Sequence, residues 1–271
     1  MQKIIISLLL VLGSLVSSAQ TIADPPKNPL NFLIRALERE AQTNLTGEVL
    51  ETQIFPPRAE PNKIRADLPM PPFSPDWIRK NFMVTASFGE AIANRETWKI
   101  SLEPRNSEAA SFTFWIDQKW LLRLGIEERD SSNEMTFAAR FNSFSGNPKP
   151  RQNPRQFILL ENKPKLEAFV QRETALQLPI GFQLFDLRPR TVGKNNLPAL
   201  ELRASNGISV LVIVFAPIGT GNQARVAVRN ISGSFVWVIG NLPHSDLEKT
   251  ANSIKAPLDL ALLMAGFQNL R

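Results

Sequence analysis

The sequence predicts an α+β fold of two domains, each built from an antiparallel sheet and helices. Five segments between residues 81 and 144 are separated by turn residues, and several of them alternate apolar with polar side chains, which is typical of antiparallel strands. Residues 208–218 (ISVLVIVFAPI) are apolar throughout, which indicates the central strand of a second sheet. Residues 145–156 lie between these regions and have the proline- and arginine-rich composition of a linker.

The composition limits both the size of the core and the chemistry. The chain has 271 residues and 43% apolar content, enough for one large core or two modest ones. It has no cysteine and a single histidine, which excludes disulfides, a thiolate nucleophile and a Cys/His zinc site. The net charge of +6 favours an anionic membrane surface or an acidic partner.

The first 19 residues have the features of a signal peptide. Lys3 supplies a positive charge, residues 4–16 are apolar, and Ser17 and Ala19 are the small residues that signal peptidase requires. The apolar run is shorter than the roughly 20 residues that a membrane-spanning helix needs. We therefore expect export to the periplasm, where a nucleic acid is not an expected partner.

The first domain is expected to begin with a helix. Asn28 is a good helix cap, and Pro29 suits the first helical position because its missing N–H group costs nothing there. A strand is expected at 45–55, followed by an extended loop at 56–75, because seven prolines in that stretch rule out a central strand. The apolar stripe of the helix consists of Leu30, Leu33, Ile34, Leu37 and Ala41, and the five later strands are expected at 81–88, 95–104, 110–117, 120–130 and 135–144.

The second domain is expected from about Leu176. Residues 157–175 are ambiguous between strand and helix. A capping-box pattern at Ser245 and Glu248 predicts a helix to about Ile254, and residues 257–267 predict a further amphipathic helix. The strands of this sheet are expected at 178–192, 198–205, 208–218, 223–230 and 234–243.

Charged side chains at two strand ends are the first places to look for a reaction. Asp117 and Lys119 lie where two strands fold back, and aspartate favours turns because it bonds nearby backbone groups. Glu127, Glu128 and Asp130 cluster at a strand end, but a working pair of carboxylates needs opposed placement in a cleft. We interpret the first pair as a turn and the second group as a solvated strand end.

The single histidine and one glycine pair complete the search for catalytic residues. His244 lies directly before the expected cap Ser245, which explains the segment without catalysis. Gly219 and Gly221 are not followed by a helix with phosphate-binding spacing, so a hairpin turn is expected there. The sequence therefore predicts no enzyme, no cofactor and no metal site.

Two surfaces remain as candidate binding sites. An apolar face wider than its covering helix would leave a groove for lipid or a peptide, although the same residues suit an ordinary core. Arginines on neighbouring strands of the second domain would form a basic patch for an acidic peptide or anionic head groups, or else a scattered solvated surface. The groove residues are Trp98, Ile100, Phe112, Phe114, Leu122, Leu124 and Phe137. The arginines are Arg188, Arg190, Arg203, Arg225 and Arg229, of which Arg225 and Arg229 are expected to face solvent.

Motifs in both halves resemble the RseB/MucB family of periplasmic regulators of envelope-stress sigma factors. In the first half the resemblance lies in GEAIANRETWKISLEP, in FTFWIDQKWLLRLGIEERD and in the phenylalanine-rich strand MTFAARFNSF. In the second half it lies in LPIGF and in VIGNLPHSDLEKTANSIK. The resemblance covers roughly residues 28–255. Asn94, at the turn before the first of these strands, replaces the family's usual glycine.

The resemblance implies a fold and a function. It implies a LolA/LolB-like antiparallel half-barrel with a helix at 28–145, a linker at 146–175, and a smaller antiparallel α+β domain with closing helices at 176–271. It also implies binding of the periplasmic part of a membrane anti-sigma factor, or another envelope protein, with peripheral membrane contact. A carrier or sensor of lipids or lipoproteins is the alternative.

Overall fold

A computed structural model describes residues 24–53, 61–156, 160–161, 163–219, 225–255 and 260–268. The expected signal peptide lies outside these residues, as does most of the expected hairpin turn after Gly219. Among the described residues, no helix is long and apolar enough to cross a membrane.

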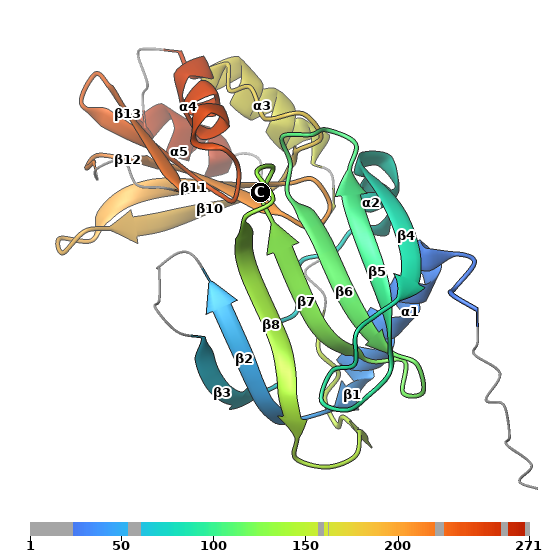
Figure 1. The fold of residues 1–271 in the computed structure, drawn as a ribbon. Helices are drawn as coiled ribbons and strands as arrows, with labels where there is room; N and C mark the ends of the chain where they lie inside the picture. Colours follow the sequence, from blue (N-terminus) through green and yellow to red (C-terminus); the bar gives the residue numbers. More distant parts are fainter. Residues whose placement is uncertain are drawn as a thin grey trace, which may run out of the picture.

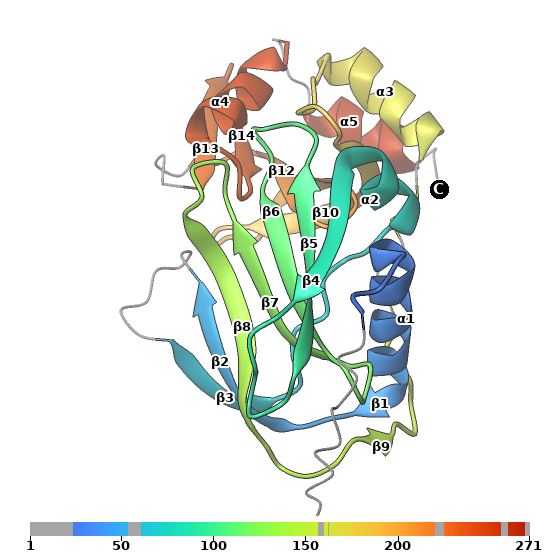
Figure 2. The same cartoon turned by 45° about the vertical axis from the view of Figure 1, so that its right-hand side comes forward.

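The first domain is a seven-stranded antiparallel sheet with a helix across one face (Figures 1 and 2). The sheet is open, with β3 and β4 at its edges. This confirms the α+β class and the antiparallel meander. In spatial order the strands are β3 (Asn62–Ala66), β2 (Gly47–Gln53), β8 (Met135–Phe144), β7 (Arg123–Arg129), β6 (Ser111–Asp117), β5 (Thr97–Pro104) and β4 (Phe82–Phe88).

Helix α1 (Pro29–Gln42) begins where the sequence predicts. Asn28 Oδ1 accepts a hydrogen bond from the backbone N–H of Asn31 at 3.1 Å, which caps the first turn. Leu33 and Leu37 on its apolar stripe are 0% and 1% exposed and pack in a single core with the sheet. The helix therefore covers an apolar face of the sheet.

The sequence analysis missed two elements, one within the expected loop at 56–75 and one that begins at its last residue. Strand β3 lies in the proline-free run between Pro61 and Pro69, at the sheet edge. Helix α2 (Pro75–Asn81) begins where the expected loop ends, with Ser74 as its N-cap residue and proline at its first position. An uninterrupted loop across this region is therefore wrong.

The second domain is a five-stranded antiparallel sheet with its helices packed on one face (Figure 2). The ambiguous residues 157–175 contain helix α3 (Pro164–Thr174). Helix α4 (His244–Ser253) starts one residue before Ser245, with Pro243 as N-cap and no side-chain cap bond, so the capping box does not form. The strands lie in the order β10 (Gln183–Val192), β11 (Leu197–Ser205), β12 (Val210–Ala216), β14 (Ser234–Ile239) and β13 (Val226–Ile231), and α5 (Leu260–Gln268) follows α4.

The chain between the domains is tied down at both ends. Strand β9 (Lys149–Pro150) pairs with β1 (Thr43–Asn44) of the first domain. The backbone N–H groups of Arg151 and Arg155 donate to carbonyl oxygens of Gln42 and Ala41 at 2.8 and 2.9 Å. Helix α3 packs in the core of the second domain. The segment that connects the two domains is therefore shorter than the expected linker 146–175.

Candidate partner-binding site between the domains

The end of β7 is bound to the second domain by a buried ion pair. Arg225 Nη2 lies 2.8 Å from Asp130 Oδ2, and each side chain is 10% exposed. Arg225 Nη1 also donates to the carbonyl oxygen of Leu242 at 3.4 Å. Burial alone would raise the pKa of Asp130, but the bond from Arg225 and backbone N–H bonds outweigh it and lower the pKa below its usual value.

Glu128, two residues earlier on β7, has the opposite electrostatics. Its side chain accepts a hydrogen bond from Asn241 Nδ2 of the second domain at 2.8 Å, and the residue is 7% exposed. Burial raises the pKa of Glu128 from 4.5 to about 7, and the bonds from Asn241 and Thr136 oppose this only in part. We call Glu128, Asp130, Arg225 and Asn241 the β7 junction.

The β7 junction overturns two expectations from the sequence. Glu128 and Asp130 do not end a solvated strand, because the second domain covers them. Arg225 does not face solvent, since it is 8% exposed and bonded to the first domain. The side chain of Arg225 points toward the first domain, where it bonds Asp130.

Helix α2 makes the other close contact between the domains. Asn81 Nδ2 donates to the carbonyl oxygens of Gly181 and Asn206 at 3.0 and 2.8 Å. The carbonyl oxygen of Gly207 accepts from Ser74 N at 2.9 Å. Gly207 has φ +117°, and a Cβ atom there would lie 2.8 Å from the backbone nitrogen of Ile78, so only glycine permits this approach.

A cavity of about 310 Å³ lies between the domains beside the β7 junction, and we call it the junction cavity. Glu128, Asn241 and Ser209 are the polar residues among those that line it. Ser209 Oγ is buried and has no hydrogen-bond partner within the described structure. The apolar walls include Met70, Phe112, Ile126, Phe137, Ile208 and Val210.

The residues expected to line an apolar groove lie mainly in the first core. Phe112 and Phe137 line the junction cavity. Phe114, which the sequence placed in the groove, is 0% exposed. The residues that are buried in the core are Trp98, Ile100, Phe112, Phe114, Leu122 and Leu124.

A larger cavity of about 430 Å³ lies beside the α2 contact. Lys80, Arg105 and Ile180 are among the residues that line it. Ile180 is 76% exposed, although it is a large apolar side chain. Two cations and an exposed apolar residue therefore share a second surface formed by both domains.

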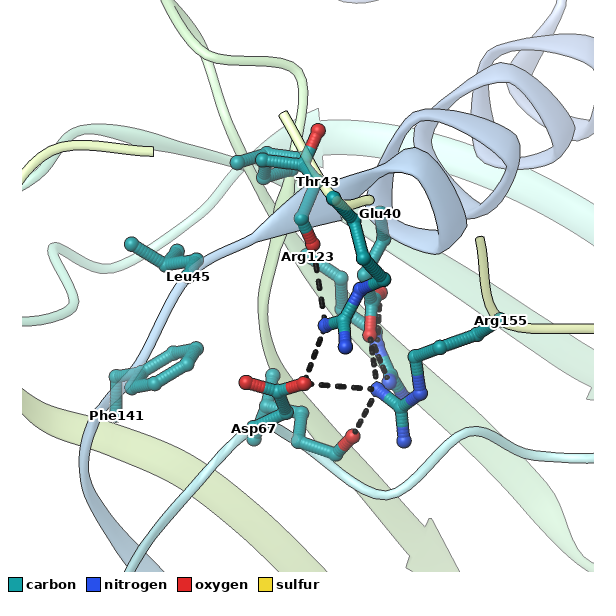
Figure 3. Close-up of a pocket in the computed structure, with 10 residues that line it drawn as sticks. Glu40, Thr43, Leu45, Asp67, Arg123, Phe141 and Arg155 are labelled. Carbon is teal, nitrogen blue, oxygen red and sulfur yellow. Dashed lines mark hydrogen bonds and ion pairs between the residues drawn. The ribbon is translucent and has the colours of Figure 1, made fainter. Parts of the chain in front are cut away.

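Charged residues beneath the C-terminal end of α1 form a closed network (Figure 3). Arg123, which is 1% exposed, donates to both carboxylate oxygens of Glu40 at 2.7 and 2.9 Å. Arg151 pairs with Asp67, and Arg155 lies 3.8 Å from Asp67 and 3.9 Å from Glu40. The space they enclose is about 10 Å³, roughly room for one water molecule. The network fastens the chain after β9 to the first domain rather than forming a ligand pocket.

The five arginines of the expected basic patch all have partners within the chain. Arg190 and Arg203 both bond Glu201. Burial alone would raise the pKa of Glu201. The hydrogen bonds and positive charges of Arg203 and Arg190 have the larger effect together, so the pKa lies below its usual value. Arg188 pairs with Asp186, Arg225 with Asp130, and Arg229 Nη1 donates to the carbonyl oxygens of Ala251, Asn252 and Ile254 at 3.1, 2.8 and 2.7 Å. A role of these residues in binding stays a prediction.

The turn at Asp117 is confirmed. Its Oδ1 accepts from the backbone N–H groups of Lys119, at 2.9 Å, and Trp120, while Lys119 itself is exposed. Asp117 is also 1% exposed and paired with Arg95 at 2.6 Å, which the sequence analysis did not predict. This is a structural ion pair that holds the hairpin.

The single histidine lies beside an acidic residue of α4. His244 Nε2 lies 3.3 Å from Glu248 Oε1 on the next turn of α4. No group of three or more histidine, aspartate and glutamate side chains in the described ranges is placed to hold a metal ion.

The fold and the site define a two-domain protein. Its first domain is an open antiparallel sheet with a helix packed on one face, and buried polar contacts join this domain to a small α+β domain. No family model and no curated protein matches the sequence. The structure is similar to a chain of the Pseudomonas aeruginosa MucA/MucB complex, with a TM-score of 0.59 and 13% identity over 84% of this chain and 98% of that chain. It is similarly related to MucB in complex with MucA(peri), with a TM-score of 0.60, and to MucB alone, with 0.55, both at 13% identity. The fold is therefore RseB/MucB-like.

Proposed function

We propose that this chain is an exported, non-enzymatic regulatory protein that binds the periplasmic segment of a membrane anti-sigma factor in envelope-stress signalling. The observation that carries the proposal is the structural similarity to MucB, which spans 84% of this chain and 98% of the matched chain in the MucA/MucB complex. The match includes both domains. The order of the family-like motifs along the sequence supports the same assignment.

The arrangement of the two domains supports a binding role. The β7 junction and the α2 contact fix one domain against the other, and both cavities described above are formed by residues of the two domains. A rigid two-domain surface presents a preorganised binding site, which lowers the entropy lost when a flexible segment binds. Shielding such a segment from proteases would need no catalytic residue.

The alternative, a carrier or sensor of lipids or lipoproteins, has less support. The apolar face expected to hold an acyl chain is packed against α1, with Leu33, Ile100 and Phe114 each 0% exposed. Mass spectrometry of the protein purified from its native envelope would test this alternative, because a lipid carrier should retain bound acyl chains.

Capture from the native envelope tests the proposed function. The bait is the chain from residue 20 onward, cross-linked in intact cells, and the control bait is an unrelated exported protein of similar size and charge. We expect mass spectrometry to recover a single-pass membrane protein with the bait and not with the control. If no single-pass membrane protein is enriched, the proposed function is wrong.

A further inference from the structure

The polar atoms of the junction cavity are arranged to accept hydrogen bonds. Glu128 contributes a carboxylate, of which one oxygen accepts the bond from Asn241, and among the described residues no side chain donates to the other oxygen within hydrogen-bond distance. Asn241 Nδ2 is already committed to Glu128 at 2.8 Å. A ligand that fills this cavity should therefore bring its own donors.

The charge balance of the cavity favours a cation. Arg225 is the nearest positive charge, but it is bonded to Asp130 and to the carbonyl oxygen of Leu242. The other groups that act on Glu128 are the neutral Asn241 and Thr136 and the negative Asp130. In the described part of the chain Glu128 thus has no ion-pair partner, and a buried carboxylate without one is unfavourable. Its raised pKa is the expected consequence.

The walls indicate the shape of that cation. Met70, Ile126, Phe137 and Val210 present apolar surface suited to a methylene chain. A guanidinium group binds best as a fork to two free carboxylate oxygens, but Asn241 already occupies one oxygen of Glu128. A compact ammonium group with three rotatable donors fits the remaining acceptors better.

We propose that the junction cavity receives a lysine side chain of the partner polypeptide, with its ammonium group at Glu128 and its methylene chain against Met70 and Phe137. The proposal rests on the proposed function only in naming a partner polypeptide as the source of the lysine. Recognition of an alkylammonium group by the cavity is a property of this chain alone and is tested without the partner.

The first test is a titration of the full mature chain with three six-carbon probes, followed through methyl NMR signals of Met70, Ile126 and Val210. At about pH 8, hexylammonium should give saturable shifts, hexanol should bind about tenfold more weakly, and hexanoate should not bind, because a hydrogen bond to a charged group is worth more than a neutral one. Hexylammonium affinity should fall as the pH drops through about 7, where Glu128 takes up a proton. Equal binding of hexanol or hexanoate, or no saturable shift, would overturn the proposal.

Variants show whether Glu128 is the group that selects the ammonium. Glu128→Gln should remove the preference for hexylammonium over hexanol. The matched control is Glu127→Gln, on the same strand, because Glu127 bonds Arg129 and Arg140 rather than lining the cavity. The proposal fails if Glu127→Gln lowers the affinity as much as Glu128→Gln does.

The second test uses the envelope protein captured by the wild-type bait. Glu128→Gln should reduce its capture about tenfold, while Glu127→Gln should not. If the wild type and Glu128→Gln capture it equally, the lysine proposal is wrong and the proposed function stands. If the wild type captures no single-pass membrane protein, the proposed function is wrong, and the probe titration still decides whether the cavity recognises an ammonium group.

Discussion

Replacing Glu128 by glutamine should change how the stability of the protein depends on pH. Glu128 is buried, and its pKa in the folded protein is raised from 4.5 to about 7. Below pH 4.5 the carboxyl group is protonated in both folded and unfolded states and does not affect the balance between them. Between 4.5 and about 7 the unfolded state loses the proton while the folded state keeps it, so stability falls as the pH rises.

The size of this effect follows from the two pKa values. A pKa raised from 4.5 to about 7 lowers the free energy of unfolding by about 3 kcal/mol as the pH rises from 4.5 to 7. Above pH 7 this loss remains constant. Glutamine has nearly the same shape and does not titrate. The free energy of unfolding of Glu128→Gln relative to wild type should therefore rise by about 3 kcal/mol from pH 4.5 to 8, whatever its value at low pH.

Urea unfolding followed by tryptophan fluorescence measures this difference at steps of half a pH unit. The dependence on urea should be the same in both proteins, so that the midpoints report stability. Carbon-13 NMR of the Glu128 side chain gives an independent check, with a titration midpoint near 7. Parallel pH profiles for the two proteins, or a midpoint near 4.5, would refute the reasoning about burial at the β7 junction.

Three further substitutions test other contacts. Arg123→Met should cost about 3–5 kcal/mol in urea unfolding because it removes both hydrogen bonds to the buried Glu40 carboxylate and leaves only the longer contact with Arg155, and Glu40→Gln added to it should recover part of that loss. Arg229→Ala should cost about 1–2 kcal/mol because it removes a cation from the C-terminal end of α4. The control Arg188→Ala, at an exposed pair, should change stability by less than about 1 kcal/mol, and equal effects of the two would contradict the capping role. Gly207→Ala should speed hydrogen exchange at the N–H group bonded to the Gly207 carbonyl oxygen, and unchanged exchange would show that the close approach to α2 is not needed.

The elements that the sequence predicted carry their signals locally. Asn28 and Pro29 define the start of α1 within two residues, and the hydrogen bond to Asn31 forms as expected. Apart from β3, the strands of both sheets were found from their apolar patterns and from the turn residues between them. These features depend on neighbours in sequence, so a single sequence is sufficient to find them.

The missed helix α2 had a local signal that the density of prolines concealed. Ser74, Pro75 and Asp76 form an ordinary helix start, with proline at the first position and an acidic residue in the first turn. Strand β3 was missed because the many prolines of residues 56–75 were taken to exclude a strand anywhere in that segment. The run between Pro61 and Pro69, however, contains no proline.

The β7 junction had no signal that one sequence could supply. Asp130 and Arg225 are 95 residues apart, and Glu128 and Asn241 are 113 residues apart. Each of these residues is polar and lies next to a turn, so solvent exposure was the natural expectation. The packing of one domain on the other decides which polar residues are buried, and that information lies in the tertiary structure.

Calorimetric titration of the mature chain with the soluble segment of the captured membrane protein tests the central claim of partner binding most directly. We predict saturable binding of the folded protein, weakened about tenfold by Glu128→Gln and unchanged by Glu127→Gln. Absence of saturable binding between the two purified components would contradict the claim that this chain holds the exported segment of a membrane anti-sigma factor.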